Sequence, residues 1–382
     1  RLTIGRLRRE IEPVTAAQLL RFLFRWQHVQ PGSQLHGREG IVSVIGQLQG
    51  MELVAPAWER EVLPSRIGRF SGADLEHLCF SGVVGWGRLR LRPDVAEDEK
   101  VPRRRQMLTR SASLGLFLRE NLAYLLALGS DGSDDITGLS SVARGILRHL
   151  QARGACFLFE IAKAVSLLES QVEEALWELV ARGLVTSDGI AGLRLLLAKG
   201  RERRPPHRRF RTIHGGLTRT HPTLAGRWSL LREARESPVN QKAEADEVIA
   251  RQLLRRYGVI LRELLTRETC VPSWRTLLGI YRRLEARGEI RGGRFVDGFS
   301  GEQFALPEAV EGLRALRRNR DGREMVLVSA TDPLNLVGIL TPGGRISPLS
   351  GQTILYVDGV PEDIDETHKL QARLRRAQVV LT

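Results

Sequence analysis

The sequence predicts a mainly α-helical protein with small β elements, an α+β fold in which tandem winged-helix domains precede a small β-barrel or β-sheet module. Two observations lead to this prediction. Groups of helical segments are followed by short strand-like segments, and the pattern from residue 325 onward turns to strands. Helices closed by a β-hairpin are typical of a winged helix. Because 382 residues exceed what one hydrophobic core usually supports, two to four compact units are expected.

The first unit, expected at residues 1–110, combines helical spacing with a final strand pattern. Helical patterns are expected in four segments: 14–29, 40–49, 57–67 and 73–80. Residues 82–92 then alternate as a strand does, which favours a winged helix. A connecting segment follows at 111–138, where the apolar runs fit strand and helix about equally.

A second winged helix is expected at residues 139–198. Its helices are expected at 139–152, 157–165 and 170–182, with Asp188-Gly189 as the turn of a closing hairpin. The third helix would face the major groove of DNA. Its solvent side is acidic, which favours a packing role over base reading because carboxylates repel phosphates; the acids are Glu169, Glu173, Glu174 and Glu178.

A third winged helix is expected at residues 225–318, after a linker. Long helices are expected at 243–267 and at 274–288, where Gly288 ends the second one. The pair Gly292-Gly293 suits a tight hairpin turn. Arg291 and Arg294 would flank this wing and contact phosphates. Pro307 would open a short helix at its favoured first position.

The last module, expected at residues 319–382, reads as strands. The segments MVLVSA, LVGIL and TILYVDG are separated by turn residues, which predicts a small sheet or barrel. The residues from 364 to 382 have a helical pattern. This module is therefore expected to be a β-barrel or β-sheet with a C-terminal helix.

Charge indicates a polyanionic partner. The net charge is +14 and the pI about 10.7, and all but five of the 58 basic residues are arginine. A GC-rich genome explains the ratio of arginine to lysine but not the excess over acids. The linker at 199–224 is the most basic segment, and it could follow a phosphate backbone or be a solvated tether. Its candidate nucleic-acid-binding residues are Arg203, Arg204, Arg208, Arg209 and Arg211.

Other features of the sequence exclude several classes. No apolar run reaches membrane-spanning length, so no membrane partner is expected. Three widely spaced cysteines predict neither a disulfide framework nor a zinc site, and no metal site is expected from the histidines. The chain begins with Arg1 and has no signal-peptide pattern, from which we expect a piece of a longer, cytoplasmic and nucleoid-associated protein.

Several long segments resemble the carboxy-terminal region of Lhr (large helicase-related) helicases. They are residues 13–64, 253–268, 274–314 and 329–343. The resemblance implies a parent protein that is a superfamily 2, 3′-to-5′ ATP-dependent DNA helicase involved in DNA repair. ATP and Mg²⁺ would belong to motor lobes outside this chain, because the sequence has no G-x-x-x-x-G-K-[ST] and no Asp-Glu-x-His box. No cofactor is therefore expected in this segment.

The first block also resembles DNA glycosylases of the AlkZ/YcaQ type, which are tandem winged helices with a Gln-hydrophobic-Gln motif. Gln47-Leu48-Gln49 matches that motif, although the continuation at 50–53 departs from it. The resemblance implies that Gln49 positions an attacking water or an extruded base and that Gln47 supports it. These two glutamines are the candidate catalytic residues.

The function expected from the sequence is that of a DNA-binding region that guides single-stranded DNA for the helicase motor. The expected partners are single-stranded or tailed duplex DNA and the parent motor lobes, with self-association left open. Trp26 and Trp58 are candidates for stacking on unpaired bases, and core packing is the alternative. Two other functions remain open: a glycosylase for uracil or an alkylated base, and an oligomerisation scaffold. Whether this segment is itself an enzyme is thus undecided.

Overall fold

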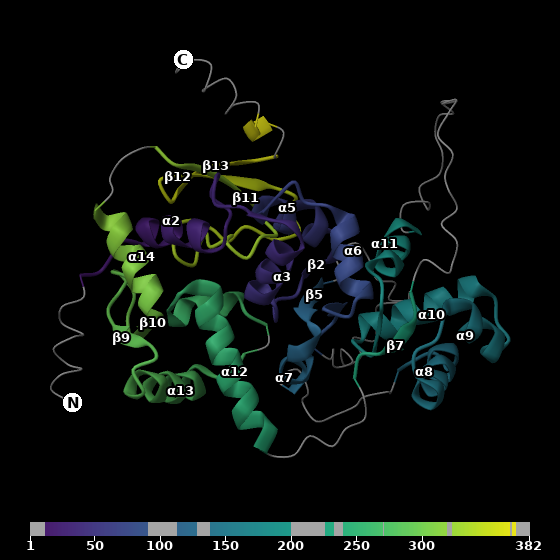
Figure 1. The fold of residues 1–382 in the computed structure, drawn as a ribbon. Coiled ribbons are helices and arrows are strands. Elements are labelled where there is room, and N and C mark those ends of the chain that lie inside the picture. The colour runs from purple at the N-terminus through teal and green to yellow at the C-terminus, as the bar shows by residue number, and fades with distance from the viewer. Residues whose placement is uncertain are drawn as a thin grey trace, which may run out of the picture. The chain divides into compact units, whose positions relative to one another are not determined.

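The fold was analysed in a computed structural model (Figure 1). It describes residues 12–90, 113–127, 138–199, 226–232, 240–269, 271–318, 323–366 and 369–371. Helices and small sheets alternate, which gives the mixed α and β fold that was predicted. The chain forms two compact units, one from Arg1–Phe70 with Pro238–Thr382 and the other from Ser71–Ser237. No helix among the described residues is both long and apolar enough to cross a membrane.

Unit 1 begins with helix α2 (Ala16–Trp26), which Thr15 and Gln18 start with a reciprocal capping box. Helix α3 (Gly37–Leu48) follows. The single helix predicted at 57–67 is instead three short segments: α4 (Ala55–Ala57), the π-helical turn η1 (Trp58–Val62) and α5 (Leu63–Arg66). Pro64 lacks an N–H for the regular ladder, so the preceding turn widens. The strands β1 (Leu35–His36) and β3 (Ile67–Gly68) pair in parallel.

The carboxy-terminal winged helix of unit 1 contains α12 (Asn240–Tyr257), α13 (Trp274–Ala286) and α14 (Pro307–Arg318). The helix predicted at 243–267 is therefore too long. It ends because Gly258 has a φ of +68°, and the apolar residues that follow form β8 (Val259–Ile260) and a 3₁₀ turn, Arg262–Arg267. Two predicted boundaries are confirmed. Helix α13 stops just before Gly288, which has a positive φ, and helix α14 starts at Pro307.

The wing of this domain differs from the predicted tight hairpin. Strand β9 (Arg291–Gly293) contains both glycines and pairs with β10 (Gln303–Ala305), so the turn lies at 294–302. The buried side chain of Gln303 shapes this longer loop. Its Oε1 accepts from the Phe295 and Val296 N–H groups at 2.7 and 2.8 Å, and its Nε2 donates to the Val296 carbonyl. A side-chain amide that bonds to the backbone of its own loop in this way leaves no periodic pattern in the sequence.

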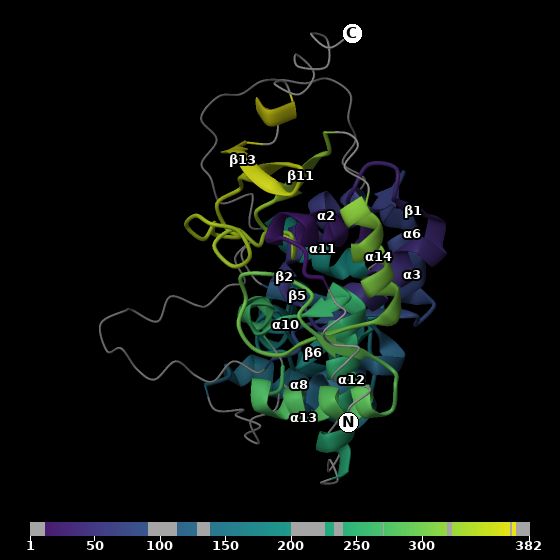
Figure 2. The ribbon, with the colours of Figure 1, turned by 90° about the vertical axis from the view of Figure 1, so that its left-hand side faces the viewer.

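The last module is an open three-stranded antiparallel sheet of β11 (Met325–Ser329), β12 (Thr353–Val357) and β13 (Val360–Asp365). The barrel alternative is not confirmed. The predicted strand at 336–340 is wrong, because these residues form hydrogen-bonded turns. The helix expected from 364 begins too early, since β13 continues to Asp365; residues 372–382 lie outside the described residues. In Figures 1 and 2 the sheet lies alongside α2, and the Tyr356 and Phe24 rings are 5.1 Å apart.

Unit 2 contains α6 (Gly72–Phe80) and an antiparallel pair of β4 (Val84–Gly87) with β5 (Ser113–Leu118). Its further helices are α7 (Leu122–Ala127), α8 (Ser141–Arg153), α9 (Leu158–Val165) and α10 (Glu169–Ala181). The three helices predicted from 139 onward are confirmed. The Trp86 ring packs edge-on to Trp228 at 6.2 Å in the core of this unit.

The hairpin predicted at Asp188-Gly189 is wrong. Strand β6 (Val185–Ser187) is followed by helix α11 (Ile190–Lys199), and its antiparallel partner is β7 (Trp228–Leu230). The segment IAGLRLLLAK is rich in leucine and alanine, which favour a helix over a returning strand. The basic linker between α11 and β7 lies outside the described residues.

Candidate active site at three converging helix ends

Gln47 and Gln49 lie at the carboxy-terminal end of α3. Gln49 is the C-cap of this helix, which ends there because Gly50 has a φ of +94°. Both side chains point into unit 1, with 8% and 4% of their surface exposed. The motif is therefore an internal feature of this unit.

The ends of α2 and α12 meet this motif. The last carbonyls of a helix have no partner inside the helix, so buried ones need other donors. Gln47 Nε2 donates to the carbonyl of Trp26, at the end of α2, at 2.9 Å, and to that of Arg255, near the end of α12, at 3.4 Å. Gln27 Nε2 donates to the Arg256 carbonyl at 2.9 Å. The buried amides thus satisfy carbonyls of both helices.

Side chains from α12 satisfy the end of α3 in return. Gln252 Nε2 donates to the carbonyls of Gly46 and Gln47 at 3.1 and 2.8 Å. Its Oε1 accepts from Gln49 Nε2 at 3.1 Å. The guanidinium of Arg256 donates to the Leu48 carbonyl at 3.4 Å and to that of Gln49. Three helix C-termini therefore converge, joined by reciprocal contacts.

The electrostatic consequence is a partial negative charge near the glutamines. Each helix C-terminus carries roughly half a negative elementary charge. The positive charge of Arg256 is balanced by a buried ion pair with Glu268, whose other oxygen accepts from the Tyr257 hydroxyl at 2.8 Å. Burial, and then the Glu268 charge, raise the pKa of Tyr257 well above 10.0, so this phenol stays protonated and donates.

One buried acceptor at this site is left without a donor. Gln47 Oε1 has no hydrogen-bond partner among the described residues, although its amide nitrogen has two. A buried unsatisfied oxygen costs about 1–3 kcal/mol. It would be satisfied by a bound water or by an N–H group of a ligand.

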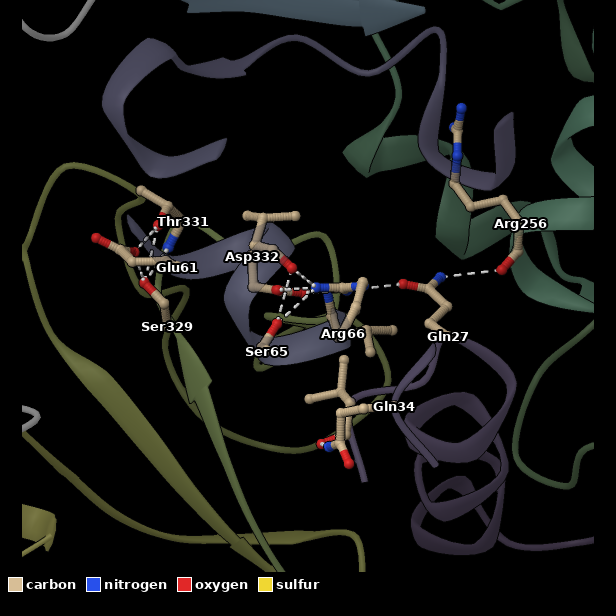
Figure 3. Close-up of polar contacts among 12 residues, drawn as sticks. Gln27, Gln34, Glu61, Ser65, Arg66, Arg256, Ser329, Thr331 and Asp332 are labelled. Carbon is tan, nitrogen blue, oxygen red and sulfur yellow. Dashed lines mark hydrogen bonds and ion pairs between the residues drawn. The ribbon is translucent and has the colours of Figure 1, made fainter. Parts of the chain in front are cut away.

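Beside the helix ends lies a buried ion pair that joins α5 to the β module (Figure 3). Arg66 donates from its two terminal nitrogens to the two carboxylate oxygens of Asp332, at 2.6 and 2.9 Å. Both side chains are enclosed. Arg66 also donates to Gln27 Oε1 at 3.1 Å, and the same Gln27 reaches the Arg256 carbonyl. This chain of contacts holds the module against the helix ends.

A second carboxylate, Glu61, is half-buried in the π-helical turn. One of its oxygens, Oε2, accepts hydrogen bonds from the hydroxyls of Ser329 and Thr331, which lie 2.8 Å from each other (Figure 3). These two hydroxyl donors hold the carboxylate of Glu61 in place against the β module. Among the described residues, no group of three or more His, Cys, Asp and Glu side chains could hold a metal ion.

The other sequence-predicted residues fall into three groups. Trp26 is half-buried, stacks on Phe22 with ring centroids 5.3 Å apart, and shares the helix ends with the glutamines. Trp58 is only 2% exposed and packs in the core. In this structure its ring is not available to stack on a base. Arg291 and Arg294 are exposed on the wing. The predicted linker arginines, 203, 204, 208, 209 and 211, lie outside the described residues.

Sequence reasoning missed the partners that complete the site. Gln27, Arg66, Gln252 and Arg256 had no distinguishing local pattern, because such residues usually lie at the surface. Asp332 is different, since it belongs to the stretch at 329–343 that resembles the helicase family. An acidic residue in such an apolar stretch was the available signal for a buried carboxylate.

Comparisons with known protein families match two segments of the chain. Residues 239–325 match the family described as large helicase-related protein, winged-helix domain, in its fourth-domain form. Residues 14–101 match the third-domain form.

Two curated relatives match nearly the whole chain. It is 30% identical over 369 residues to the Lhr helicase/uracil glycosylase of Escherichia coli strain K12, covering 88% of this chain and 22% of that protein. It is 29% identical over 382 residues to the Lhr helicase/probable uracil glycosylase of Mycolicibacterium smegmatis, covering 94% and 24%. The chain thus spans about a quarter of the length of these relatives.

Among solved structures, the fold is similar to that of Streptomyces sahachiroi DNA glycosylase AlkZ. The TM-score is 0.51 at 14% sequence identity, and the match covers 92% of this chain and 87% of AlkZ. At this identity the likeness concerns the fold alone.

Proposed function

Because this chain belongs to the large helicase-related (Lhr) family, we propose that it is a DNA-binding repair region that removes a base from DNA as a glycosylase. The observation that carries the proposal is the pair of activities in the names of the relatives, taken together with the fold of this chain. Their names join a helicase with a uracil glycosylase, and the quarter that this chain matches has the fold of a DNA glycosylase. The sequence of this quarter contains no ATPase motif, so the glycosylase is the activity that fits it.

The converging helix ends support this chemistry. When the bond between sugar and base breaks, positive charge develops on the sugar, as in other glycosyl transfers. Dipoles that are fixed before the reaction stabilise such charge without a cost of reorganisation. The negative ends of α2, α3 and α12 are dipoles of the required sign, and they meet at Gln47 and Gln49.

The glutamines would then act through their amides. In the proposed reaction the base leaves with the electron pair of the glycosidic bond and takes a proton, while a water oxygen bonds to the sugar carbon. Gln49 would orient this water, and the unsatisfied Oε1 of Gln47 would accept a hydrogen bond from the water or from the extruded base. Because both amides are buried, the nucleotide must displace part of their present contacts.

The test is single-turnover incubation of the chain, without ATP, on a single-stranded oligonucleotide that carries one uracil, followed by alkaline cleavage. We expect product from the wild type and a loss of roughly 100-fold or more in Gln49→Ala. Gln34→Ala is the matched control, because this half-buried amide also donates to backbone carbonyls, those of Gln30 and Val29, but lies outside the motif. Absence of product from a folded wild type would refute the proposal.

A second candidate function is supported by the charge. With a net charge of +14, the region could guide single-stranded DNA to motor lobes that carry ATP and Mg²⁺, without chemistry of its own. The same experiment separates the two functions. Salt-sensitive binding without product would favour the guide over the glycosylase.

A further inference from the structure

Helix α13 is the third helical segment of the carboxy-terminal winged helix, after α12 and the 3₁₀ turn at Arg262–Arg267. Its outward face has two arginines with a glycine between them. Arg275, Gly279 and Arg283 are spaced four residues apart, so they follow one another along the same face. Both arginines are exposed. A Cβ atom added at Gly279 would meet only the far end of Arg283, at 3.9 Å. The helix backbone is therefore open to close approach at this point.

These arginines differ from their neighbours in their ion pairs. Arg282 pairs with Glu302 at 2.6 Å, and Arg287 pairs with Glu247 at 3.4 Å. By contrast, the other exposed arginines of α13 and of the start of its wing have no carboxylate partner among the described residues; they are Arg275, Arg283, Arg291 and Arg294. The first two lie on α13, and the other two begin the adjoining wing. The outward face of α13 and the start of its wing thus carry positive charge without a counter-charge.

The corresponding helix of unit 2 shows that this charge does not simply follow the arginine-rich composition. Helix α10 has the same place in its helix order and the same length of 13 residues. Its exposed side includes Glu169 and Glu174. The two third helices therefore carry opposite charge, and only α13 suits a polyanion.

We propose that α13 and its wing, residues 274–294, form a docking face for duplex DNA. Resting on the proposed DNA-binding function, this inference names the form of DNA and the face that receives it. Helix α13 would enter the major groove, with Arg275 and Arg283 on phosphates or guanine edges and the bare backbone at Gly279 against the groove. Arg291 and Arg294 would contact the adjoining phosphates. A duplex is required because a single strand has no groove to admit a helix.

The experiment measures binding of the full chain to a duplex of about 20 base pairs and to a single strand of equal length, by fluorescence anisotropy at several salt concentrations. We expect the Arg275→Ala/Arg283→Ala variant to bind the duplex at least 10-fold more weakly. The slope of log affinity against log salt should fall by about 2, one released counterion per lost contact. Single-strand binding should change by less than the duplex binding does.

Two further variants exclude a general charge effect. Arg282→Ala removes one positive charge from the same helix, but from an arginine that is held in an ion pair, and it should leave duplex affinity within 2-fold. Gly279→Leu keeps every charge and adds bulk between the two arginines. It should lower duplex affinity about 10-fold without lowering the melting temperature, because leucine favours a helix more than glycine does.

The proposal would be overturned if Arg282→Ala lost half as much duplex affinity, on a logarithmic scale, as Arg275→Ala/Arg283→Ala does. A Gly279→Leu protein that binds duplex normally would overturn it too. The readout is binding and needs no turnover. A wild type that forms no product would therefore contradict the glycosylase alone, whereas intact excision with unchanged duplex binding in these variants would contradict only the docking face.

Discussion

Arg66 and Arg256 are both fully enclosed, and each donates to one carboxylate and to backbone carbonyls. Their positions could not be predicted from the sequence. In a chain with 58 basic residues, most of them arginine, nothing local separates an enclosed arginine from an exposed one. The glutamine pair could be predicted because its spacing resembles a known motif. The acceptors of the two amides could not, since they lie on other helices.

Glu324 allows a prediction at the scale of single residues. It accepts from Arg21 at 3.0 Å and also pairs with Arg25. Burial raises the pKa of this carboxyl, but the hydrogen bond from Arg21 and the charge of Arg25 outweigh it and hold the pKa below its usual 4.5. The folded-state pKa is thus lower than the unfolded one. The stabilisation is present above about pH 4.5 and is lost as the pH falls through the folded-state pKa.

We therefore expect Glu324→Gln to lower the free energy of unfolding by about 1 kcal/mol at pH 7 and by less at pH 3. Urea denaturation of wild type and variant at both pH values measures this. Glu362→Gln is the control, because Glu362 is exposed and 3.5 Å from Arg323. A difference that persists unchanged at pH 3 would contradict the role given to this carboxylate.

At the scale of elements, the predictions succeeded where a local signal marks the end of a helix or strand. They failed where such a signal was overlooked, or where a strand pairs with a distant segment. Pro307 marked the start of α14 correctly. The glycine at 258 was an available stop signal that ends α12 ten residues before the predicted end at 267. Strand β7 lies far from its partner β6 in sequence, so a local hairpin at Asp188-Gly189 was predicted in its place.

The hairpin of β12 and β13 was missed although its turn is marked in the sequence. Asp358 and Gly359 form its two-residue loop with φ angles of +49° and +80°, as a type I′ turn requires. A Cβ atom on Gly359 would lie 2.0 Å from the carbonyl oxygen of Ala17 in α2. The turn therefore needs glycine twice, for its backbone angle and for its contact.

Gly359→Ala should lower the free energy of unfolding by at least about 2 kcal/mol, from backbone strain together with overpacking. The matched control is Gly351→Ala. Gly351 also has a positive φ, of +70°, but a Cβ atom there would meet nothing within 4 Å, so the loss should be about 1 kcal/mol. Equal losses in chemical denaturation would show that the contact with α2 contributes nothing.

For the whole molecule, composition predicted a basic, multi-unit protein of helices and small sheets, and this coarse description holds. The six linear segments proposed from the sequence stay predictions. The grouping of residues 1–70 with residues 238–382 could not be foreseen, because it depends on contacts between side chains more than 200 positions apart. Such contacts leave no trace in local periodicity.

The basic linker gives the prediction at this scale. Replacing four of its arginines, Arg203, Arg204, Arg208 and Arg209, with alanine should weaken binding to all DNA sequences alike. It should also reduce the slope of log affinity against log salt by about 3, at the slope for single strands. Titration of a single-stranded oligonucleotide at four salt concentrations measures this slope. An unchanged slope would mean that the linker does not contact the phosphate backbone.

The pairing of Arg66 with Asp332 has a consequence for folding during synthesis on the ribosome. The two residues are 266 positions apart, and unit 2 is encoded between them. At typical rates of about 5–20 residues per second, the arginine emerges roughly 15 to 50 s before its carboxylate exists. During that interval the first seventy residues cannot complete their core, while the intervening unit has all of its own residues and can close first. Nascent chains that are stalled before residue 332 should therefore aggregate more and depend more on chaperones than chains that extend beyond it.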